Sequence, residues 1–192
     1  PVRELLTYRR YLLIKRQAIF YRDRWIQFLP RILSVPLRAF PRTANWIIGA
    51  RETGVFLRWI ERCFSSVREI TNQLKTLAPD AVLIAYRNLP SRALDLDYLK
   101  ASKALGIPTA IPVFSWDTLT TKGLLQIMPD RIFAWNEEQV AELKEHHRVP
   151  TELVRVVGAY QFDNWLSYNK PSTDRATFCA THGLRAEDPI LL

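Results

Sequence analysis

Apolar residues in the first part of the chain recur with the spacing of helices. Over residues 2 to 28, pairs of apolar residues repeat every seven positions with arginine and lysine between them, which predicts one long amphipathic helix. These pairs are Leu5/Leu6, Leu12/Leu13 and Ile19/Phe20. Prolines at positions 30, 36 and 41 should then interrupt regular structure and bend the chain, because each lacks a backbone donor. A second helical period runs from Phe56 to Leu77 and should stop at Ala78-Pro79-Asp80.

Beyond residue 80, short apolar runs alternate with helical patterns. The run from Ala81 to Tyr86 is too short for a helix in this setting and suits a strand buried on both faces. A helix should follow from about Ala93 to Leu105, where Gly106 supplies a left-handed cap. The remaining elements are expected as strands at Thr109–Phe114, Arg131–Trp135 and Leu153–Val157 and a helix at Glu137–His147. This alternation predicts an α/β fold with a Rossmann-like parallel sheet, helices on both of its faces, and ligands at the carboxyl ends of its strands.

Turn residues and charge divide the chain into parts. We expect a basic helical arm at residues 1–50, a Rossmann-like domain at 51–166, a polar linker at 167–174 and the start of a second domain at 175–192. Within the last part, Arg175 to Thr181 is predicted as a helix and Pro189 to Leu192 as a strand. Because the sequence opens at Pro1 without a methionine and stops inside that strand, both ends are expected to be truncated.

The positive charge is concentrated at the N-terminal end. The formal net charge is +8, and residues 1 to 42 carry ten basic and two acidic side chains, so the whole excess lies there. Such an arm, with its aromatic side chains, suits an anionic membrane surface. Alternatively, its apolar stripe packs on the domain. No nucleic-acid-binding motif supports a nucleic-acid partner.

Other features of the sequence restrict the class of protein. Hydrophobic residues make up 48% of the chain, as in ordinary globular proteins. No apolar run approaches the roughly 18 residues of a membrane span, and Cys63 and Cys179 have no spacing typical of a disulfide framework or a metal site. We therefore expect a cytoplasmic protein, attached peripherally to the inner face of the plasma membrane if the arm binds lipid, with no bound metal. His146 and His147, at the end of a helix predicted to be exposed, are assigned no role.

The densest candidate site follows the second predicted strand. Residues 115 to 123 read Ser-Trp-Asp-Thr-Leu-Thr-Thr-Lys-Gly, so hydroxyls, a carboxylate and an amine are available to hold a hydroxylated or phosphorylated ligand. The indole of Trp116 can stack on a sugar face. In the alternative reading, Ser115 and Asp117 cap a turn, Trp116 is a core residue and Lys122 is solvated.

Two further segments follow later strands. Asn136 and Glu137 open a helix, where capping by Asn136 and Gln139 is a sufficient explanation and ligand binding an alternative one. Gly158 permits a sharp exit from the last strand, either toward a ligand or toward a linker helix. Arg87 and Arg92 flank Pro90 and can hold an anionic group or remain solvated. The candidate ligand-binding residues are therefore Arg87, Ser115, Trp116, Thr120, Lys122, Asn136, Glu137, Gly158, Gln161 and Asp163.

Three motifs in succession carry a family resemblance. The segments Val113–Gly123, Pro129–Glu137 and Val157–Asp163 resemble those of bacterial surface-polysaccharide glycosyltransferases and their CDP-glycerol glycerophosphotransferase-like relatives. The resemblance covers roughly residues 79 to 192, and it departs from the family pattern at Thr118, where asparagine is expected, and at Tyr160, where proline is expected.

The resemblance implies a GT-B fold of two Rossmann-like halves, of which this chain is the N-terminal one. That half would bind a sugar or lipid-linked acceptor, and the missing half would bind a nucleotide-sugar or CDP-glycerol donor, which is a substrate rather than a cofactor. It implies inverting transfer in cell-surface polysaccharide or glycolipid synthesis, with Asp117 as the candidate base. The alternatives are a catalytically silent, membrane-associated binding domain and a glycerophosphotransferase of the CDP-glycerol type. If the fold is right, Ser115, Asp117, Asn136, Glu137 and Gly158 should share one edge of the sheet.

Overall fold

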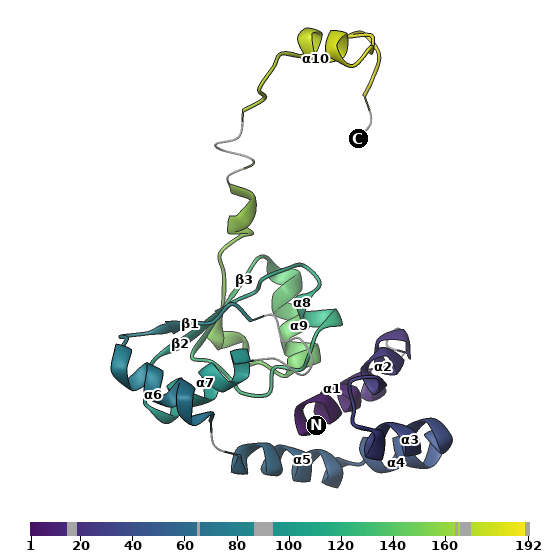
Figure 1. Cartoon of the computed structure of the whole chain (residues 1–192), viewed down its shortest axis with the longest axis vertical. Helices are drawn as coiled ribbons and strands as arrows, with labels where there is room; N and C mark the ends of the chain where they lie inside the picture. The colour runs from purple at the N-terminus through teal and green to yellow at the C-terminus, as the bar shows by residue number, and fades with distance from the viewer. Residues whose placement is uncertain (15–18, 65, 87–93, 164, 166–169, 191–192) are drawn as a thin grey trace. The chain divides into compact units, whose positions relative to one another are not determined.

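A computed structural model describes the chain except for residues 15–18, 65, 87–93, 164, 166–169 and 191–192 (Figure 1). It forms two compact units, Pro1–Gly158 and Ala159–Leu192, which are described separately below.

The first unit opens with a series of helices. They are α1 (Val2–Leu13), α2 (Ile19–Ile26), α3 (Arg31–Ala39), α4 (Pro41–Gly49), α5 (Arg51–Cys63) and α6 (Arg68–Leu77). The prediction of one helix over residues 2 to 28 is wrong, because Ile14 is extended, with φ −77° and ψ 113°, and ends α1. Pro30 and Pro41 do mark boundaries, since they lie at the starts of α3 and α4, where a missing backbone donor costs little. Pro36, in contrast, lies inside α3.

The predicted helical period from residue 56 to 77 is divided between two helices. Phe64 is extended, with φ −74° and ψ 124°, and ends α5 before α6 begins at Arg68. The predicted stop after Leu77 is confirmed, because Ala78 takes a left-handed conformation with φ 44° and its N–H donates to the carbonyl of Leu74. Apolar spacing alone cannot reveal the break, since both helices keep the same period across it.

A four-stranded sheet forms the centre of the first unit. Its strands are β1 (Val82–Leu83), β2 (Thr109–Pro112), β3 (Arg131–Ala134) and β4 (Val154–Val156). They are all parallel and lie in the order β1-β2-β3-β4, which confirms the predicted parallel sheet, although each strand is shorter than expected. The connecting helices are α7 (Leu94–Ala104), α8 (Thr118–Thr121) and α9 (Glu137–His147), with a 3₁₀ turn at Thr151–Leu153.

Helices cover one face of this sheet. On that face, Ile84, Ile111, Ile132 and Val154 pack in one core with side chains of the connecting helices. The contributing helical residues are Leu96 and Leu99 of α7, Leu119 of α8 and Leu143 of α9. Because the strand order follows the chain order, right-handed crossovers place every connecting helix on the same side.

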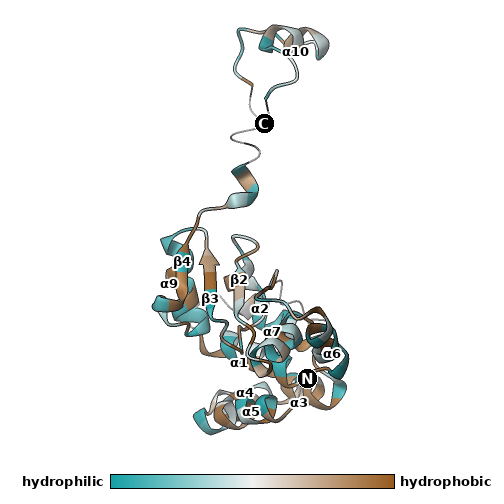
Figure 2. Cartoon of the chain, turned by 90° about the vertical axis from the view of Figure 1, so that its left-hand side faces the viewer, coloured by the Kyte–Doolittle hydropathy of each residue, from teal (hydrophilic) through white to brown (hydrophobic). Residues whose placement is uncertain are grey.

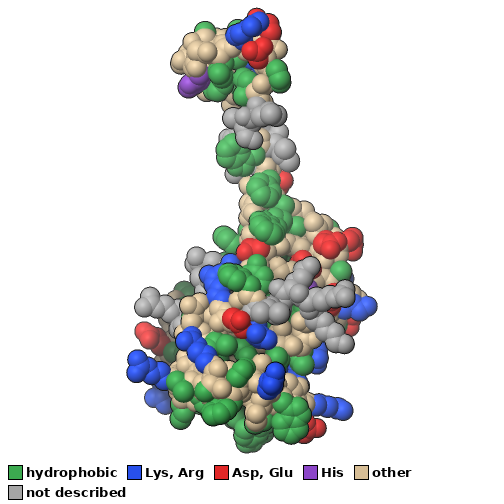
Figure 3. Space-filling view, turned by 90° about the vertical axis from the view of Figure 1, so that its right-hand side faces the viewer, with side chains coloured by type: hydrophobic (Ala, Val, Ile, Leu, Met, Phe, Trp, Pro, Cys, Tyr) green, Lys and Arg blue, Asp and Glu red, His purple; other side chains and the backbone are tan. Residues whose placement is uncertain are grey.

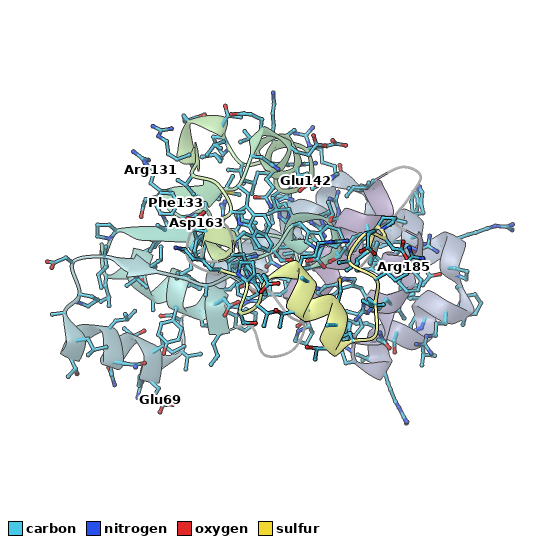
Figure 4. The ribbon with its side chains drawn as sticks, turned by 90° about the horizontal axis from the view of Figure 1, so that it is seen from above. Glu69, Arg131, Phe133, Glu142, Asp163 and Arg185 are labelled. Carbon is cyan, nitrogen blue, oxygen red and sulfur yellow. The ribbon has the colours of Figure 1, made fainter. Side chains whose placement is uncertain are left out.

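The expectation of helices on both faces, with Ala81 to Tyr86 buried on both sides, is therefore wrong for the described residues. The opposite face carries Leu83, 65% exposed, with Phe133 and the exposed Arg131. Figure 2 shows the hydrophobic ribbon of β3 on this open side. In Figure 4, Arg131 and Phe133 lie on the other side of the sheet from Glu142 of α9.

The N-terminal helices build a second core in the same unit. Leu6 and Tyr8 of α1 are buried with Trp25 of α2, Leu37 of α3 and Leu57 of α5. Arg3 ties this helix to α5 and α7, because its guanidinium lies 2.9 Å from a carboxylate oxygen of Glu61 and 2.7 Å from one of Asp97. Helix α1 is therefore a buried part of the unit and not a free arm.

The second unit contains a 3₁₀ turn at Tyr160–Phe162 and helix α10 (Arg175–Thr181). The predicted helix is confirmed, and Asp174 caps it by accepting a 2.9 Å hydrogen bond from the backbone N–H of Thr177. Residues 189 and 190 are not in a strand, and the rest of the strand expected there lies outside the described residues. None of the helices in the described part of the chain has the length and apolar character needed to cross a membrane.

Candidate functional site

The segments that leave β2, β3 and β4 meet at the carboxyl edge of the sheet. Here the carboxyl edge means residues 113–118, 135–139 and 157–158. The indole N–H of Trp135 donates to the carbonyl of Val113 over 2.8 Å, and the backbone N–H of Val157 donates to the carbonyl of Ala134 over 2.9 Å. These two bonds join the three segments side by side. The parallel topology thus brings Ser115, Asp117, Asn136, Glu137 and Gly158 to the same edge.

Asp117 is the most highly connected polar side chain of this edge. Its carboxylate accepts a 2.9 Å hydrogen bond from the hydroxyl of Thr121 and lies 3.3 Å from the ammonium of Lys122. Burial by itself would raise the pKa of Asp117, but hydrogen bonds from Ser115, Thr121 and Lys122, together with the charge of Lys122, bring that pKa below its usual value. Asp117 is consequently ionised at neutral pH and only weakly basic.

Trp116 is the most exposed aromatic side chain of the edge. It is 73% exposed, and the neighbouring Phe114 is 45% exposed. The reading in which Trp116 is a core residue is therefore wrong. A flat, exposed indole beside a carboxylate and an amine is suited to hold a sugar ring, with apolar contact on one face and hydrogen bonds at its hydroxyls.

The predicted capping of α9 is confirmed. The side-chain oxygen of Asn136 accepts a 3.0 Å hydrogen bond from the backbone N–H of Gln139, and the Gln139 side chain accepts one of 2.8 Å from the N–H of Trp135. Asn136 is thus committed to the helix start. Glu137 is exposed in the first turn of α9 and makes no ion pair with any described residue, so its carboxylate remains available to a ligand.

Gly158 is a further candidate residue within the carboxyl edge. Gly158 has φ 84°, a left-handed conformation that favours glycine, where the chain leaves β4. Gln161 and Asp163 belong to the second unit, and Arg87 lies outside the described residues. Ligand roles for these three residues stay predictions. Metal binding has no visible basis in the described part of the chain, where no three His, Cys, Asp or Glu side chains gather.

Helix α1 fixes the loop that carries the site, which the sequence did not predict. The hydroxyl of Tyr11 donates to the carbonyl of Thr120 over 3.1 Å and to that of Lys122 over 2.8 Å. Arg10 donates to the carbonyl of Leu119 over 2.9 Å and also to that of Lys122. The sequence holds one sign of this contact. Arg10 lies four positions after Leu6, so it is a charged residue on the apolar stripe of the helix.

His147 completes this contact from the end of α9, and the expectation that it is exposed is wrong, since it is 2% exposed. Its Nδ1 accepts a 3.0 Å hydrogen bond from the backbone N–H of Leu125, so the ring proton is on Nε2, which lies 2.7 Å from the carbonyl of Leu119. Burial, followed by the charge of Arg10, lowers the pKa of His147 to about 3. The ring is therefore neutral and serves as a buried link between α8 and α9.

No protein-family model matches this sequence, and neither curated proteins nor solved structures gave a match. The family resemblance rests on the three motifs alone.

Proposed function

We propose that this chain is the acceptor-binding, N-terminal half of a GT-B glycosyltransferase that acts in cell-surface polysaccharide or glycolipid synthesis. The observation that supports it most directly is the exposed Trp116 next to the Asp117–Lys122 pair, at the carboxyl edge of a parallel sheet. In open α/β sheets this edge is where ligands bind. The nucleotide-activated donor would occupy a second half, as the resemblance implies.

In the reaction, an acceptor hydroxyl attacks the anomeric carbon of the donor, the bond to the nucleotide diphosphate breaks, and a base takes the hydroxyl proton. The family resemblance makes Asp117 the candidate for that base. Its lowered pKa makes it a weak base, so its contribution is better described as accepting a hydrogen bond from the acceptor while holding Lys122 in place. Glu137, exposed at the same edge and without an ion pair to any residue that the structure describes, is the second carboxylate that could take the proton in this proposal.

The experiment that tests this function is transfer of label from nucleotide-sugar donors, and separately from CDP-glycerol, to bacterial surface glycans. The complete gene product should transfer label, whereas the 192-residue chain alone should not. Transfer from CDP-glycerol in place of a sugar nucleotide would make the protein a glycerophosphotransferase. Failure of the complete product to use any of these donors would favour the silent binding domain.

A separate surface, formed by α3, α4 and α5, supports the alternative function of a membrane-associated domain. Apolar side chains that are about half exposed or more occupy this surface, which we call the α3–α5 face: Ile32, Val35, Phe40, Trp46, Ile47, Val55, Phe56 and Trp59. Exposed arginines accompany them at positions 31, 38, 42 and 51, against one exposed carboxylate, Glu52. Figure 3 shows hydrophobic side chains mixed with basic ones at the lower end of the first unit, where these helices lie.

This combination suits the interface of an anionic bilayer, where tryptophan and arginine both contribute to binding. The sequence predicted that the basic arm as a whole contacts the membrane. Because α1 is buried and the exposed residues come from α3 to α5, we propose the α3–α5 face as the contact instead. Peripheral attachment at the inner face of the plasma membrane would hold the chain at the surface where lipid-linked acceptors lie.

A further inference from the structure

A basic cavity lies at the opposite edge of the sheet from the candidate acceptor site. It has a volume of about 660 Å³ and lies between α1, α5, residues 124–128 and the end of α9. We call it the arginine groove, after Arg9, Arg10, Arg58, Arg62 and Arg148 in its walls. Residues 124–128 lead into β3 and Arg148 precedes β4, so the groove adjoins the amino ends of the strands. It is therefore separate from the carboxyl edge.

The charges of this groove are not balanced. Glu145 is the one carboxylate in its lining, against five arginines, and no ion pair joins Arg9, Arg58, Arg62 or Arg148 to any residue of the described chain. Burial lowers the pKa of Arg9, and the charges of Arg58 and Arg148 lower it further. Burial also lowers the pKa of His146. The charge of Glu145 raises that pKa, and the charge of Arg10 lowers it. The neighbouring His147 is neutral. Such a cluster is unfavourable until an anion neutralises it.

Arg9 is held rigidly in this groove with an unused donor. It is 9% exposed, and its Nη2 donates to the carbonyls of Gly49 and Ala50 over 3.2 and 3.1 Å. Its Nε is buried without an acceptor among the described residues, and so is the Nε of Arg10. The guanidinium of Arg9 rests against Gly54 of α5, where a Cβ atom would come within 2.6 Å of Cζ. A buried, fixed guanidinium donor without an acceptor is the condition in which an added anion gains most.

We propose that the arginine groove binds a ligand bearing a phosphate or diphosphate group. Guanidinium groups match phosphate oxygens in geometry as well as charge. The groove also exposes apolar side chains of Leu6, Leu13 and Met128, which can receive an apolar part of the same molecule. A second cavity of about 420 Å³ shares Arg58 and Arg62, and its two lysines are already paired, Lys100 with Glu61 of the same lining and Lys103 with Asp130. Both volumes fall within the range of small-molecule sites.

The test uses isothermal titration of the 192-residue chain with sodium pyrophosphate and, in parallel, with dodecyl phosphate below its micelle concentration. The variant is Arg58→Gln with Arg62→Gln, and the control is Arg68→Gln with Arg131→Gln, which removes the same charge from exposed positions outside the groove. We expect pyrophosphate affinity to fall about tenfold or more in the groove variant and to stay unchanged in the control.

The two ligands distinguish the sources of the phosphate. Tighter binding of dodecyl phosphate than of pyrophosphate would identify a lipid phosphate, and equal or weaker binding would identify a soluble one, both in support of the groove. Equal loss of affinity in the groove variant and the control, or no binding by the unaltered chain at about 1 mM ligand, would overturn the proposal. Arg148→Gln provides a second groove variant if the double variant does not fold, as judged by circular dichroism.

Discussion

The guanidinium of Arg10 lies 3.0 Å from Nε2 of His147, within the buried contact between α1 and the end of α9. Both groups reach the carbonyl of Leu119, at 2.9 and 2.7 Å. Since that ring nitrogen carries its proton, the two groups act as parallel donors to one acceptor. The shape of the loop that displays Trp116 is thus set by α1, which is far from it in sequence.

Replacing Arg10 with methionine should destabilise the chain by about 2 kcal/mol. Methionine keeps most of the side-chain volume but removes one of the two donors to each of the carbonyls of Leu119 and Lys122, so that only His147 and Tyr11 still donate to them. Urea unfolding followed by tryptophan fluorescence gives the free energy of unfolding. Arg24→Met is the control, because Arg24 is exposed, and it should change stability by less than about 0.5 kcal/mol. Equal effects of the two substitutions would contradict a structural role for Arg10.

His147 should make the chain less stable as the pH falls below its unfolded pKa of about 6.5. The pKa is about 3 in the folded chain, so between these values the unfolded state binds a proton that the folded state does not. Stability then decreases by up to about 1.4 kcal/mol per pH unit on going down from pH 6.5 toward pH 3.

A comparison with His147→Gln separates this effect from the titration of carboxylates. The slope of unfolding free energy against pH between 4.5 and 6.5 should be smaller in the variant than in the unaltered chain. Identical slopes would mean that His147 takes up its proton in the folded chain near its ordinary pKa.

Gly54→Ala tests the packing of Arg9 against α5. In an exposed helix this change stabilises by up to about 1 kcal/mol. Here the new Cβ would displace the guanidinium, whose hydrogen bonds to Gly49 and Ala50 would be lost, so we expect destabilisation by about 1 kcal/mol. In an Arg9→Ala background the same change should instead stabilise. Absence of this reversal in a double-mutant cycle would show that the two residues are not coupled.

Binding to anionic vesicles should depend on the α3–α5 face. We expect Trp46→Ser with Trp59→Ser to reduce co-sedimentation with anionic vesicles several-fold, because both indoles are more than half exposed there. High salt should also reduce it. Trp116→Ser serves as the matched control from outside this face. If neutral vesicles bind equally well, or if the control loses as much binding, the membrane proposal fails.

Local patterns predicted the sheet and its edge well. Glu137–His147 was predicted at its observed bounds because Asn136 and Gln139 form a complete capping box at its start. Gly106 follows the end of α7 as expected, with φ 72°. Such signals lie within a few residues of one another, so the sequence displays them directly.

Features that depend on contacts between distant segments were not predictable in the same way. The contact of Arg10 with Leu119 joins residues 109 positions apart, and the sequence marks it only by a charge on an apolar stripe. The open face of the sheet follows from a strand order that no local pattern records. Ile14 and Phe64, which end α1 and α5 in extended conformations, are ordinary helix residues by type, so no local signal marks these ends.

The central claim is that the carboxyl edge binds the acceptor through Trp116. Its most direct test is isothermal titration of the chain with surface-polysaccharide oligosaccharides, comparing Trp116→Ala with Trp46→Ala. The two tryptophans are 73% and 77% exposed, so each variant removes an equally accessible indole. We predict that Trp116→Ala weakens binding about tenfold or more, while Trp46→Ala leaves it unchanged. Equal affinity of the two variants for every oligosaccharide would contradict the account.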